Sequence, residues 1–310
     1  MNIIKKLYKK IIPDQTRENI VLFFKSTKTR QHLFRKLKIE RFSKKNCFYI
    51  SSKQCNNTYR QSTSKTAIHF HIFYTDLLEE IYEHIKNINT NYDLFVSTNG
   101  EEKLEEIKLF FKNHILNVRN IIFDNVTNRG RDVWPFIKMI SPVYTNYDFV
   151  AHLHTKKSIT QGERGNLWRK YLYNNILGNG FYFDNLIAFL EQHKEIGIIA
   201  PPPFPDESMY YAYSTRGSME CKTNLDKLFK KTGTDIKSGN PLEYQYSPGN
   251  MFISRSSAIK QVFNHKFEEY DFPIEIGQQS NTLHHTMEQC WHYYAQYNGY
   301  KYKECLLINK

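Results

Sequence analysis

This sequence lacks the features that would mark a membrane-spanning, secreted or zinc-binding protein. No stretch approaches the roughly 18–20 uninterrupted apolar residues that cross a bilayer. The first six residues, M-N-I-I-K-K, contain neither the apolar core nor the cleavage site of a signal peptide. The five cysteines are scattered without a C-x-x-C spacing, which indicates reduced thiols rather than zinc ligands. We therefore expect the protein to stay in the cytoplasm.

Length and composition favour a folded α/β protein. With 310 residues, 40% of them hydrophobic and 15% aromatic, the chain has ample material for a core. The charged fraction of 24% is ordinary for a globular protein. Global disorder and a small disulfide-stapled scaffold are excluded, and the size suits one large domain with an appendage.

The positive charge is concentrated in one segment. Residues 1–50 hold 14 lysines and arginines against three acidic residues, so +11 of the net charge of +12 lies there. Apolar residues recur at helical spacing around residues 3–12 and again in 20–37, with basic residues between them. We assign residues 1–60 to a basic amphipathic helical arm and residues 61–310 to the main domain.

Three interpretations of the arm remain open: helices lying on an anionic membrane surface, a nucleic-acid-binding arm, or a solvated hairpin packed on the domain. Phosphate binding alone would not require the aliphatic and aromatic bulk of the arm, so we favour the membrane. Residues 51–310 carry no basic stripe or common nucleic-acid-binding motif, so no nucleic-acid partner is expected. The expected location is cytoplasmic, peripheral to the inner face of the plasma membrane.

From about residue 65 the pattern alternates between strands and helices. Strands are expected at 66–74, 92–97, 119–124, 147–154 and 196–200, and helices at 76–88, 101–116, 131–140, 166–177 and 181–193. This order predicts a doubly wound, mostly parallel sheet with helices on both faces. Because ligands of such sheets bind at the carboxyl ends of the strands, the site should gather residues that follow Tyr74, Ser97, Asp124 and His154.

Two motifs lie at those strand ends. In N-R-G-R-D-V-W-P-F, residues 128–136, Gly130 allows a tight turn and places Arg131 and Asp132 at a helix start. Arginine can grip a diphosphate, and aspartate can accept a hydrogen bond from a ribose or base. In H-L-H-T-K-K-S, residues 152–158, two histidines are followed by two cations. The alternatives are a capped helix with a surface ion pair, and core histidines beside solvated lysines.

These motifs, together with Y-D-L-F-V-S at 92–97, I-L-G at 176–178 and P-G-N-M-F-I-S-R at 248–255, resemble the rhamnan synthesis F family of bacterial polysaccharide glycosyltransferases. The likeness covers roughly residues 65–300 and leaves the basic arm outside. It implies a GT-A-like fold and transfer of a rhamnose- or galactofuranose-type sugar. The donor would be a dTDP- or UDP-linked sugar. The acceptor would be a lipid-linked oligosaccharide or growing polysaccharide of capsule, O-antigen or wall glycan.

Donor binding and metal use follow from the strand ends. Many GT-A enzymes hold a metal with an Asp-x-Asp motif, but the corresponding residues here are His154, Thr155 and Lys156. We therefore expect no metal and no other cofactor, with the lysine pair and Arg131 neutralising the diphosphate. The expected donor-binding residues are His71, Tyr74, Thr98, Asn99, Asn128, Gly130, Arg131, Asp132, His154, Lys156 and Lys157.

Inversion at the anomeric carbon needs a carboxylate that takes the acceptor proton. We choose Glu288, in an expected helix over residues 282–291, with Asp206 and Glu207 in reserve. An exposed structural glutamate is the alternative. For the acceptor or sugar we expect Trp168, Pro248, Gly249 and Asn250, since a glycine permits close approach and a tryptophan can stack on a sugar ring. Core packing is the alternative for the tryptophan.

Other classes of function remain open. A metal-dependent hydrolase could use the His-x-His pairs at residues 69–71 and 152–154, although the lysines at 156 and 157 would repel a cation. A non-catalytic carbohydrate- or nucleic-acid-binding protein is a further possibility. A nucleoside diphosphate should stabilise the transferase and a chelator should disturb the hydrolase.

Overall fold

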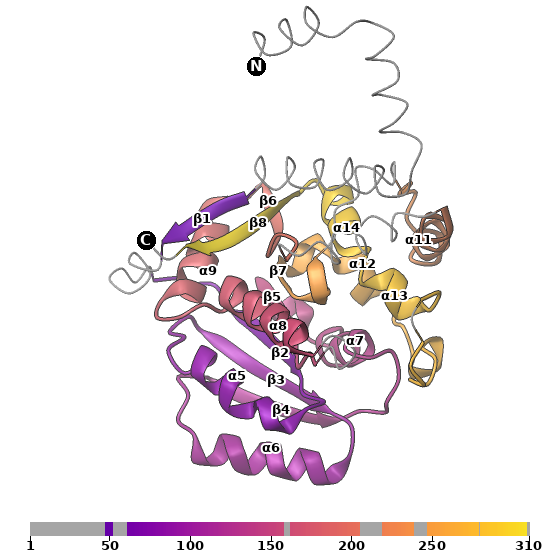
Figure 1. Ribbon diagram of the computed structural model, residues 1–310. Helices are drawn as coiled ribbons and strands as arrows, with labels where there is room; N and C mark the ends of the chain where they lie inside the picture. Colours follow the sequence, from indigo (N-terminus) through magenta and orange to yellow (C-terminus); the bar gives the residue numbers. More distant parts are fainter. Residues whose placement is uncertain are drawn as a thin grey trace, which may run out of the picture.

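The computed structural model describes residues 47–51, 61–157, 162–204, 219–238, 247–278 and 280–308 (Figure 1). The arm expected over residues 1–60 therefore lies outside the described residues except at 47–51. Two of the expected catalytic carboxylates, Asp206 and Glu207, also lie outside them. No described helix is long and apolar enough to cross a membrane.

Within these ranges one sheet of eight strands forms the centre of the domain, in the order β1-β8-β6-β7-β5-β2-β3-β4. The strands are β1 (Cys47–Ser51), β2 (Thr66–His71), β3 (Tyr92–Thr98), β4 (Asn120–Asn125), β5 (Phe149–His154), β6 (Ile196–Ala200), β7 (Phe252–Arg255) and β8 (Lys301–Ile308). All neighbours are parallel except β7, which is antiparallel to both β5 and β6. The expected α/β class is confirmed, and the sheet is mixed.

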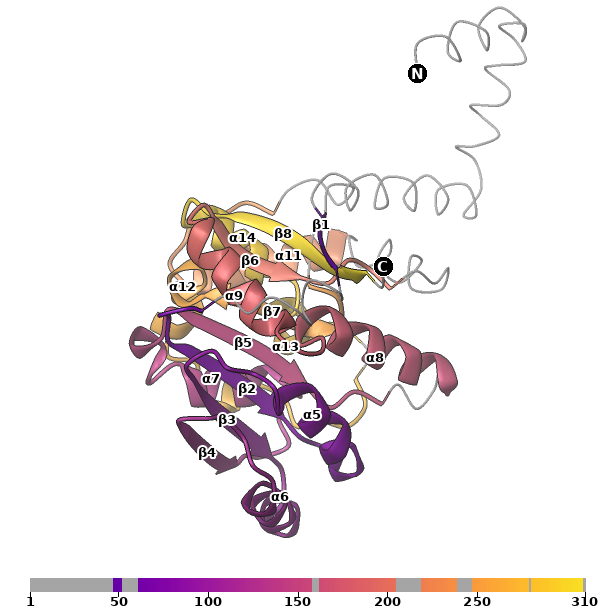
Figure 2. The same cartoon turned by 90° about the vertical axis from the view of Figure 1, so that its left-hand side faces the viewer.

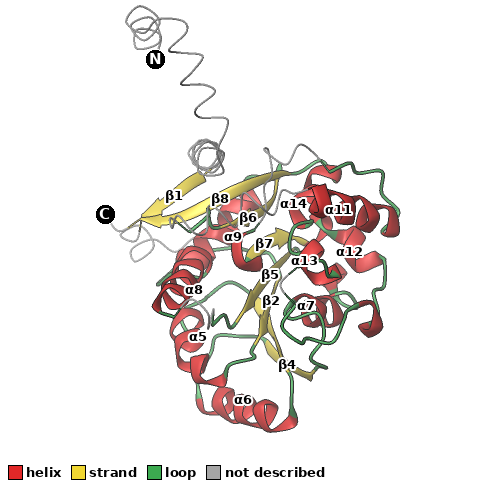
Figure 3. Ribbon diagram, turned by 45° about the vertical axis from the view of Figure 1, so that its right-hand side comes forward, coloured by secondary structure: helices red, strands yellow, loops and turns green. Residues whose placement is uncertain are grey.

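Helices cover both faces of this sheet (Figure 3). They are α5 (Leu78–Ile85), α6 (Glu101–Asn113), α7 (Val133–Ile140), α8 (Glu163–Ile176), α9 (Tyr182–Gln192), α11 (Met219–Lys231), α12 (Lys260–Asn264), α13 (Leu283–Met287) and α14 (Trp291–Tyr297). One core joins α5, α6, α8 and α9 to one face, and a second joins α7 and α11–α14 to the other. Figure 2 looks onto the face that carries α8 and α9.

The central strands β2, β3 and β5 are buried along their whole length. Helices on both faces leave no water-facing side, so the polar residues of these strands, including the histidines of β2 and β5, are buried along with the apolar ones. β2 pairs in parallel with both β3 and β5 along its whole length. The carboxyl ends of these three strands therefore meet at one edge of the sheet.

Three expectations about local structure need correction. Residues 47–51, placed in the helical arm, form the edge strand β1, which pairs with β8. The helix expected from residue 131 begins at Val133, because Gly130 and Arg131 both have positive φ. The helix expected over 282–291 is broken into α13 and α14, because the N–H groups of Gln289 and Cys290 bond three residues back and tighten the chain there.

Candidate functional site

A cluster of four histidines lies at the carboxyl ends of β2 and β5. The register sets His69 opposite His152 and His71 opposite His154. Because residues two apart in a strand face the same side, all four rings lie on one face of the sheet. The rings of His69 and His152 stack with centroids 5.3 Å apart, and Phe136 of α7 packs against His152 at 4.5 Å.

Asp132 accepts the central hydrogen bonds of this cluster. Its Oδ2 lies 3.0 Å from His152 Nε2 and 2.6 Å from Asn250 Nδ2. His154 Nε2 lies 3.8 Å from the same oxygen and 2.7 Å from the carbonyl of Gly249. Burial alone would raise the pKa of Asp132, but the neighbouring histidines and Asn250 outweigh it and hold the pKa well below its usual value. Asp132 is therefore a buried carboxylate, and its expected role as a direct ligand of ribose or base stays a prediction.

The network continues to β3 through Ser97. Its hydroxyl lies 3.0 Å from His69 Nε2 and 3.0 Å from His71 Nδ1, while His69 Nδ1 lies 3.1 Å from His152 Nδ1. Burial lowers the pKa of His69 well below its ordinary value and that of His71 to about 3. The pKa of His152 is also lowered by burial, although Asp132 opposes that shift. These three rings are neutral at physiological pH.

The N-R-G-R-D motif packs against the loop of residues 272–278. Gly130 is needed at its turn, because a Cβ there would lie 2.7 Å from Phe272 Cδ1 in addition to the positive φ. The Gly130 N–H donates to the carbonyl of Pro273, and the Glu275 N–H donates to the carbonyl of Asn128. This backbone pairing fixes the loop of residues 272–278 against the motif.

Arg131 is engaged with that loop. Its Nε lies 2.9 Å from Glu275 Oε2, and a terminal nitrogen donates to the carbonyl of Gln278. The charge of Arg131 is thus already paired, so the diphosphate contact expected of it would require this ion pair to open or be shared. Burial would raise the pKa of Glu275, but the Arg131 bond outweighs it and lowers that pKa.

The rim of the same edge combines aromatic rings and cations. The rings of Phe73 and Tyr74 meet edge to face at 4.9 Å. Lys103 Nζ lies 4.2 Å from the Phe73 ring centre, and Lys157 Nζ lies 5.0 Å from that of Tyr74 and contacts Asp76. Both aromatic rings are partly exposed. Such rings can stack on a base, and the ammonium groups can meet phosphates.

Thr155 fixes this rim to the end of β5. Its hydroxyl oxygen accepts the N–H groups of Phe73 at 2.8 Å and Tyr74 at 3.1 Å, and its own N–H donates to the carbonyl of His71 at 2.9 Å. The segment after β2 is thereby locked beside the lysines that follow β5. The structure brings Tyr74 and Lys157 together, and their expected role in donor binding stays a prediction.

A second group of expected site residues lies next to His154 and consists of Lys156, Trp168 and Gly249. Lys156 Nζ lies 4.2 Å from the Trp168 ring, and Trp168 is 7% exposed with its Nε1 buried and unpaired among the described residues. A Cβ on Gly249 would lie 2.6 Å from Leu172 Cδ1, so packing and positive φ explain this glycine. The expectation that it admits a sugar stays a prediction.

The other expected site residues lie along the same edge. Thr98 ends β3, fully buried with its hydroxyl unpaired among the described residues, and Asn99 follows it and accepts a hydrogen bond from Lys103 at 3.2 Å. Asn128 contributes its carbonyl to the loop described above. Pro248 begins the turn that leads to Gly249, and its side chain lies outside the description.

Glu288 lies close to the histidine cluster. It is half-buried at the end of α13, and its charge is near enough to raise the pKa of His152 against the larger effect of burial. His284, one turn earlier, is fully buried with both ring nitrogens unpaired among the described residues. Its Nε2 is 3.9 Å from Glu275, and burial lowers its pKa to about 4.

The described residues contain no group of three or more histidines, cysteines or acidic residues arranged to hold a metal ion. Seven of the eight ring nitrogens in the two His-x-His pairs instead lie within hydrogen-bond distance of one another, of Ser97, of Asp132 or of a backbone carbonyl, and the eighth is His71 Nε2. The hydrolase interpretation therefore gains no support from their geometry.

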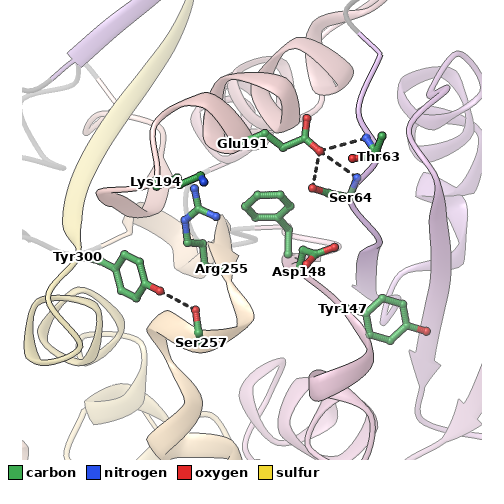
Figure 4. Close-up of a pocket in the computed structure, with 10 residues that line it drawn as sticks. Thr63, Ser64, Tyr147, Asp148, Glu191, Lys194, Arg255, Ser257 and Tyr300 are labelled. Carbon is green, nitrogen blue, oxygen red and sulfur yellow. Dashed lines mark hydrogen bonds between the residues drawn. The ribbon is translucent and has the colours of Figure 1, made fainter.

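A separate cleft of about 650 Å³ opens at the opposite edge of the sheet, near the start of β5 (Figure 4). Two of its charged side chains, Glu191 and Arg255, form hydrogen bonds that fix neighbouring segments of the chain. One carboxylate oxygen of Glu191 accepts bonds from Ser62, Thr63 and Ser64, and Arg255 donates to the carbonyl of Ile196 at 2.8 Å. We place the candidate site at the carboxyl edge, because several polar atoms there have no hydrogen-bond partner among the described residues.

Sequence analysis missed several residues of this site: Ser97, Lys103, Thr155, Glu275 and His284. Ser97 and Thr155 were within quoted motifs, so their position at strand ends was a usable signal. Nothing local distinguishes Lys103, Glu275 and His284, which reach the site only through tertiary packing.

The chain belongs to the rhamnan synthesis protein F family, which it matches over residues 15–300. The resemblance is confirmed, and the expectation that the whole basic arm lies outside it is wrong from residue 15 onward. Membership assigns the chain to polysaccharide synthesis.

Two curated relatives are each named uncharacterized protein WxcX, from Xanthomonas campestris pv. campestris strains B100 and ATCC 33913. Each is 27% identical over 220 residues, which cover 71% of this chain and 30% of the relative. The chain thus spans less than a third of the length of these relatives.

Proposed function

We propose that this protein is a GT-A-like inverting glycosyltransferase that moves a rhamnose- or galactofuranose-type sugar from a dTDP- or UDP-linked donor. The acceptor is a lipid-linked oligosaccharide or growing polysaccharide of a bacterial capsule, O-antigen or wall glycan. Family membership supports the reaction class. The observation that carries the proposal is the joining of aromatic rings, ammonium groups and a buried carboxylate network at the carboxyl edge of β2, β3 and β5.

Each part of this edge has a place in the reaction. Phe73 or Tyr74 stacks on the base, while Lys156 and Lys157 neutralise the diphosphate as it leaves. Glu288 takes the proton of the attacking acceptor hydroxyl. Asp132 and Asn250 hold the histidine cluster beneath the sugar in a fixed orientation.

The test is a panel of nucleoside diphosphates and nucleotide sugars incubated with the purified protein, with binding followed by calorimetry and transfer followed on a synthetic lipid-linked acceptor. At least one diphosphate should bind more tightly than its nucleoside. Lys156→Gln and Lys157→Gln should each remove much of that difference. Lys108→Gln is the matched control, because Lys108 is partly exposed on α6 and among the described residues pairs with Glu105. Equal binding of nucleoside and diphosphate would argue against the site.

The basic arm adds a second proposal, that the protein sits on the inner face of the plasma membrane. Neutralising Lys5, Lys6, Lys9 and Lys10 with glutamine in the full chain should weaken binding to vesicles that contain anionic lipid, because each basic residue contributes about 1 kcal/mol. Binding of the nucleotide should not change. Unaltered vesicle binding at low salt would contradict it.

A further inference from the structure

The hydrogen bonds of the histidine cluster can be followed from one end to the other with their directions. Trp291 Nε1 can only donate, and it lies 2.7 Å from Asn250 Oδ1. The Asn250 amide is therefore oriented with its Nδ2 toward Asp132, to which it donates at 2.6 Å. Asp132 is ionised and only accepts, so His152 donates to it through Nε2.

From His152 onward, each neutral ring has a single proton to give. His152 uses its proton on Nε2, so its Nδ1 must accept from the Nδ1–H of His69. His69 is then bare at Nε2 and accepts the hydroxyl proton of Ser97. The Ser97 hydroxyl hydrogen points to His69, so the Ser97 oxygen accepts a hydrogen bond from the Nδ1–H of His71. The donor and acceptor roles in each hydrogen bond thus fix the roles in the next one.

The chain of bonds ends at His71 Nε2, which carries a lone pair and no proton. This nitrogen makes no hydrogen bond with a described residue. It is also not fully buried, so a ligand can reach it. His71 ends β2 at the carboxyl edge, beside Phe73 and near enough to Lys103 for that charge to act on it. A lone-pair nitrogen at that place can accept a hydrogen bond from a ligand that brings an N–H or O–H group.

We propose that His71 Nε2 accepts a hydrogen bond from an N–H or O–H of the donor nucleotide, and that Ser97, His69 and His152 are positioning residues that hold His71 in this accepting tautomer. The inference rests on the proposed function for the identity of the ligand. The N–H source would be the imide of uracil or thymine, and the O–H source a ribose hydroxyl. Both present the same chemistry to the ring.

The tautomer is tested without ligand. Long-range ¹H–¹⁵N NMR of the full chain should show His71 protonated on Nδ1 in the wild type. In Ser97→Ala the Nδ1–H loses its acceptor, so the Nε2–H form should gain population. Ser97→Thr restores a hydroxyl and should restore the wild-type pattern. If the threonine variant does not fold, the comparison of wild type with Ser97→Ala still decides. An Nε2–H ring in the wild type would overturn the proposal.

The ligand is tested with UDP, N3-methyl-UDP, 2′-deoxy-UDP and 3′-deoxy-UDP by calorimetry. Wild type should bind UDP about 5- to 10-fold more tightly than one analogue, the size of one neutral hydrogen bond, and that analogue identifies the source. In Ser97→Ala this preference should fall toward one, whereas a steric clash of the added methyl would persist. Ser257→Ala is the control, since Ser257 is exposed and bonds Tyr300 at the opposite edge, as Figure 4 shows.

The outcomes separate this inference from the function on which it rests. UDP binding with an analogue preference that Ser97→Ala leaves unchanged would overturn the inference alone. Failure of the wild type to bind UDP and dTDP would overturn the proposed donor site and the ligand part of the inference together, while the NMR experiment would still report on the positioning residues.

Discussion

Trp291 donates its indole N–H to Asn250 at 2.7 Å, and this contact between α14 and the turn before β7 orients the amide that faces Asp132. The two residues are 41 positions apart in the chain. The structure places both residues in the buried support of the histidine cluster, and the expected sugar contact of Asn250 stays a prediction. Asn250 is 2% exposed and Trp291 is 1% exposed.

Asp132 should be the most sensitive position for stability. Asp132→Ala leaves buried N–H groups of His152 and Asn250 without an acceptor, so the free energy of unfolding should fall by about 2–6 kcal/mol, the cost of two unsatisfied buried donors. Asp132→Asn can keep an accepting oxygen and should cost less than half as much. Urea denaturation measures both. Asp148→Ala is the control, because Asp148 is exposed, and a loss there as large as that of Asp132→Ala would contradict the network as the cause.

Arg131 and Glu275 should behave as one unit. Because they bond to each other and are partly exposed, a double-alanine cycle should give a coupling in unfolding free energy of about 0.5–1 kcal/mol. Their effect on UDP affinity separates two roles. If Arg131 only fixes the loop, Arg131→Ala and Glu275→Ala should weaken UDP binding to a similar extent. If Arg131 itself binds the diphosphate, Glu275→Ala frees it and tightens UDP binding.

Glu288 tests the choice of catalytic base. Glu288→Gln keeps shape and hydrogen bonding but cannot take a proton, so turnover should fall by about 10²–10⁴ while donor affinity stays within a few-fold. Glu83→Gln serves as the control, since Glu83 is exposed on α5 and pairs with Lys86. Near-normal turnover of Glu288→Gln would move the search to Asp206 and Glu207.

Metal independence is tested by removing metal ions. If Lys156 and Lys157 balance the charge of the leaving diphosphate, transfer should continue in the presence of a strong chelator. Steady-state rates with and without chelator give the answer, and added Mn²⁺ should change them little. Activity lost on chelation and regained with Mn²⁺ would show that the lysines do not suffice.

Buried histidines should make the protein sensitive to acid. Burial lowers the pKa of His71 and His292 to about 3 and that of His284 to about 4. Below the unfolded value near 6.5, the unfolded chain binds protons that the folded chain does not, so stability falls as pH falls. Between about pH 6 and 5 the loss should approach 1.4 kcal/mol per pH unit for each ring, and below about pH 5 it should shrink for His284 as its own folded pKa is approached. Urea unfolding across this range measures it, and a flat profile would contradict it.

Local pattern was sufficient for much of the fold. Segments rich in apolar residues and bounded by turn residues predicted β2, β3, β5 and β6, because a strand covered by helices on both faces has no water-facing side to fill with polar residues. The same alternation predicted helices on both faces and a site at the carboxyl edge. The two motifs that carried the family resemblance both reach that edge.

The sequence by itself predicted most of the central strands and their helices, the carboxyl edge as the place of a candidate site, and the family, but the tertiary structure decided which partner each side chain has there. Arg131 is consistent with a phosphate ligand until Glu275, 144 residues away, is seen to pair with it. The pairing of β1 with β8 and the reversed direction of β7 also join distant segments. Local periodicity reflects only near neighbours, whereas partners and proton directions depend on which remote residues the packing brings together.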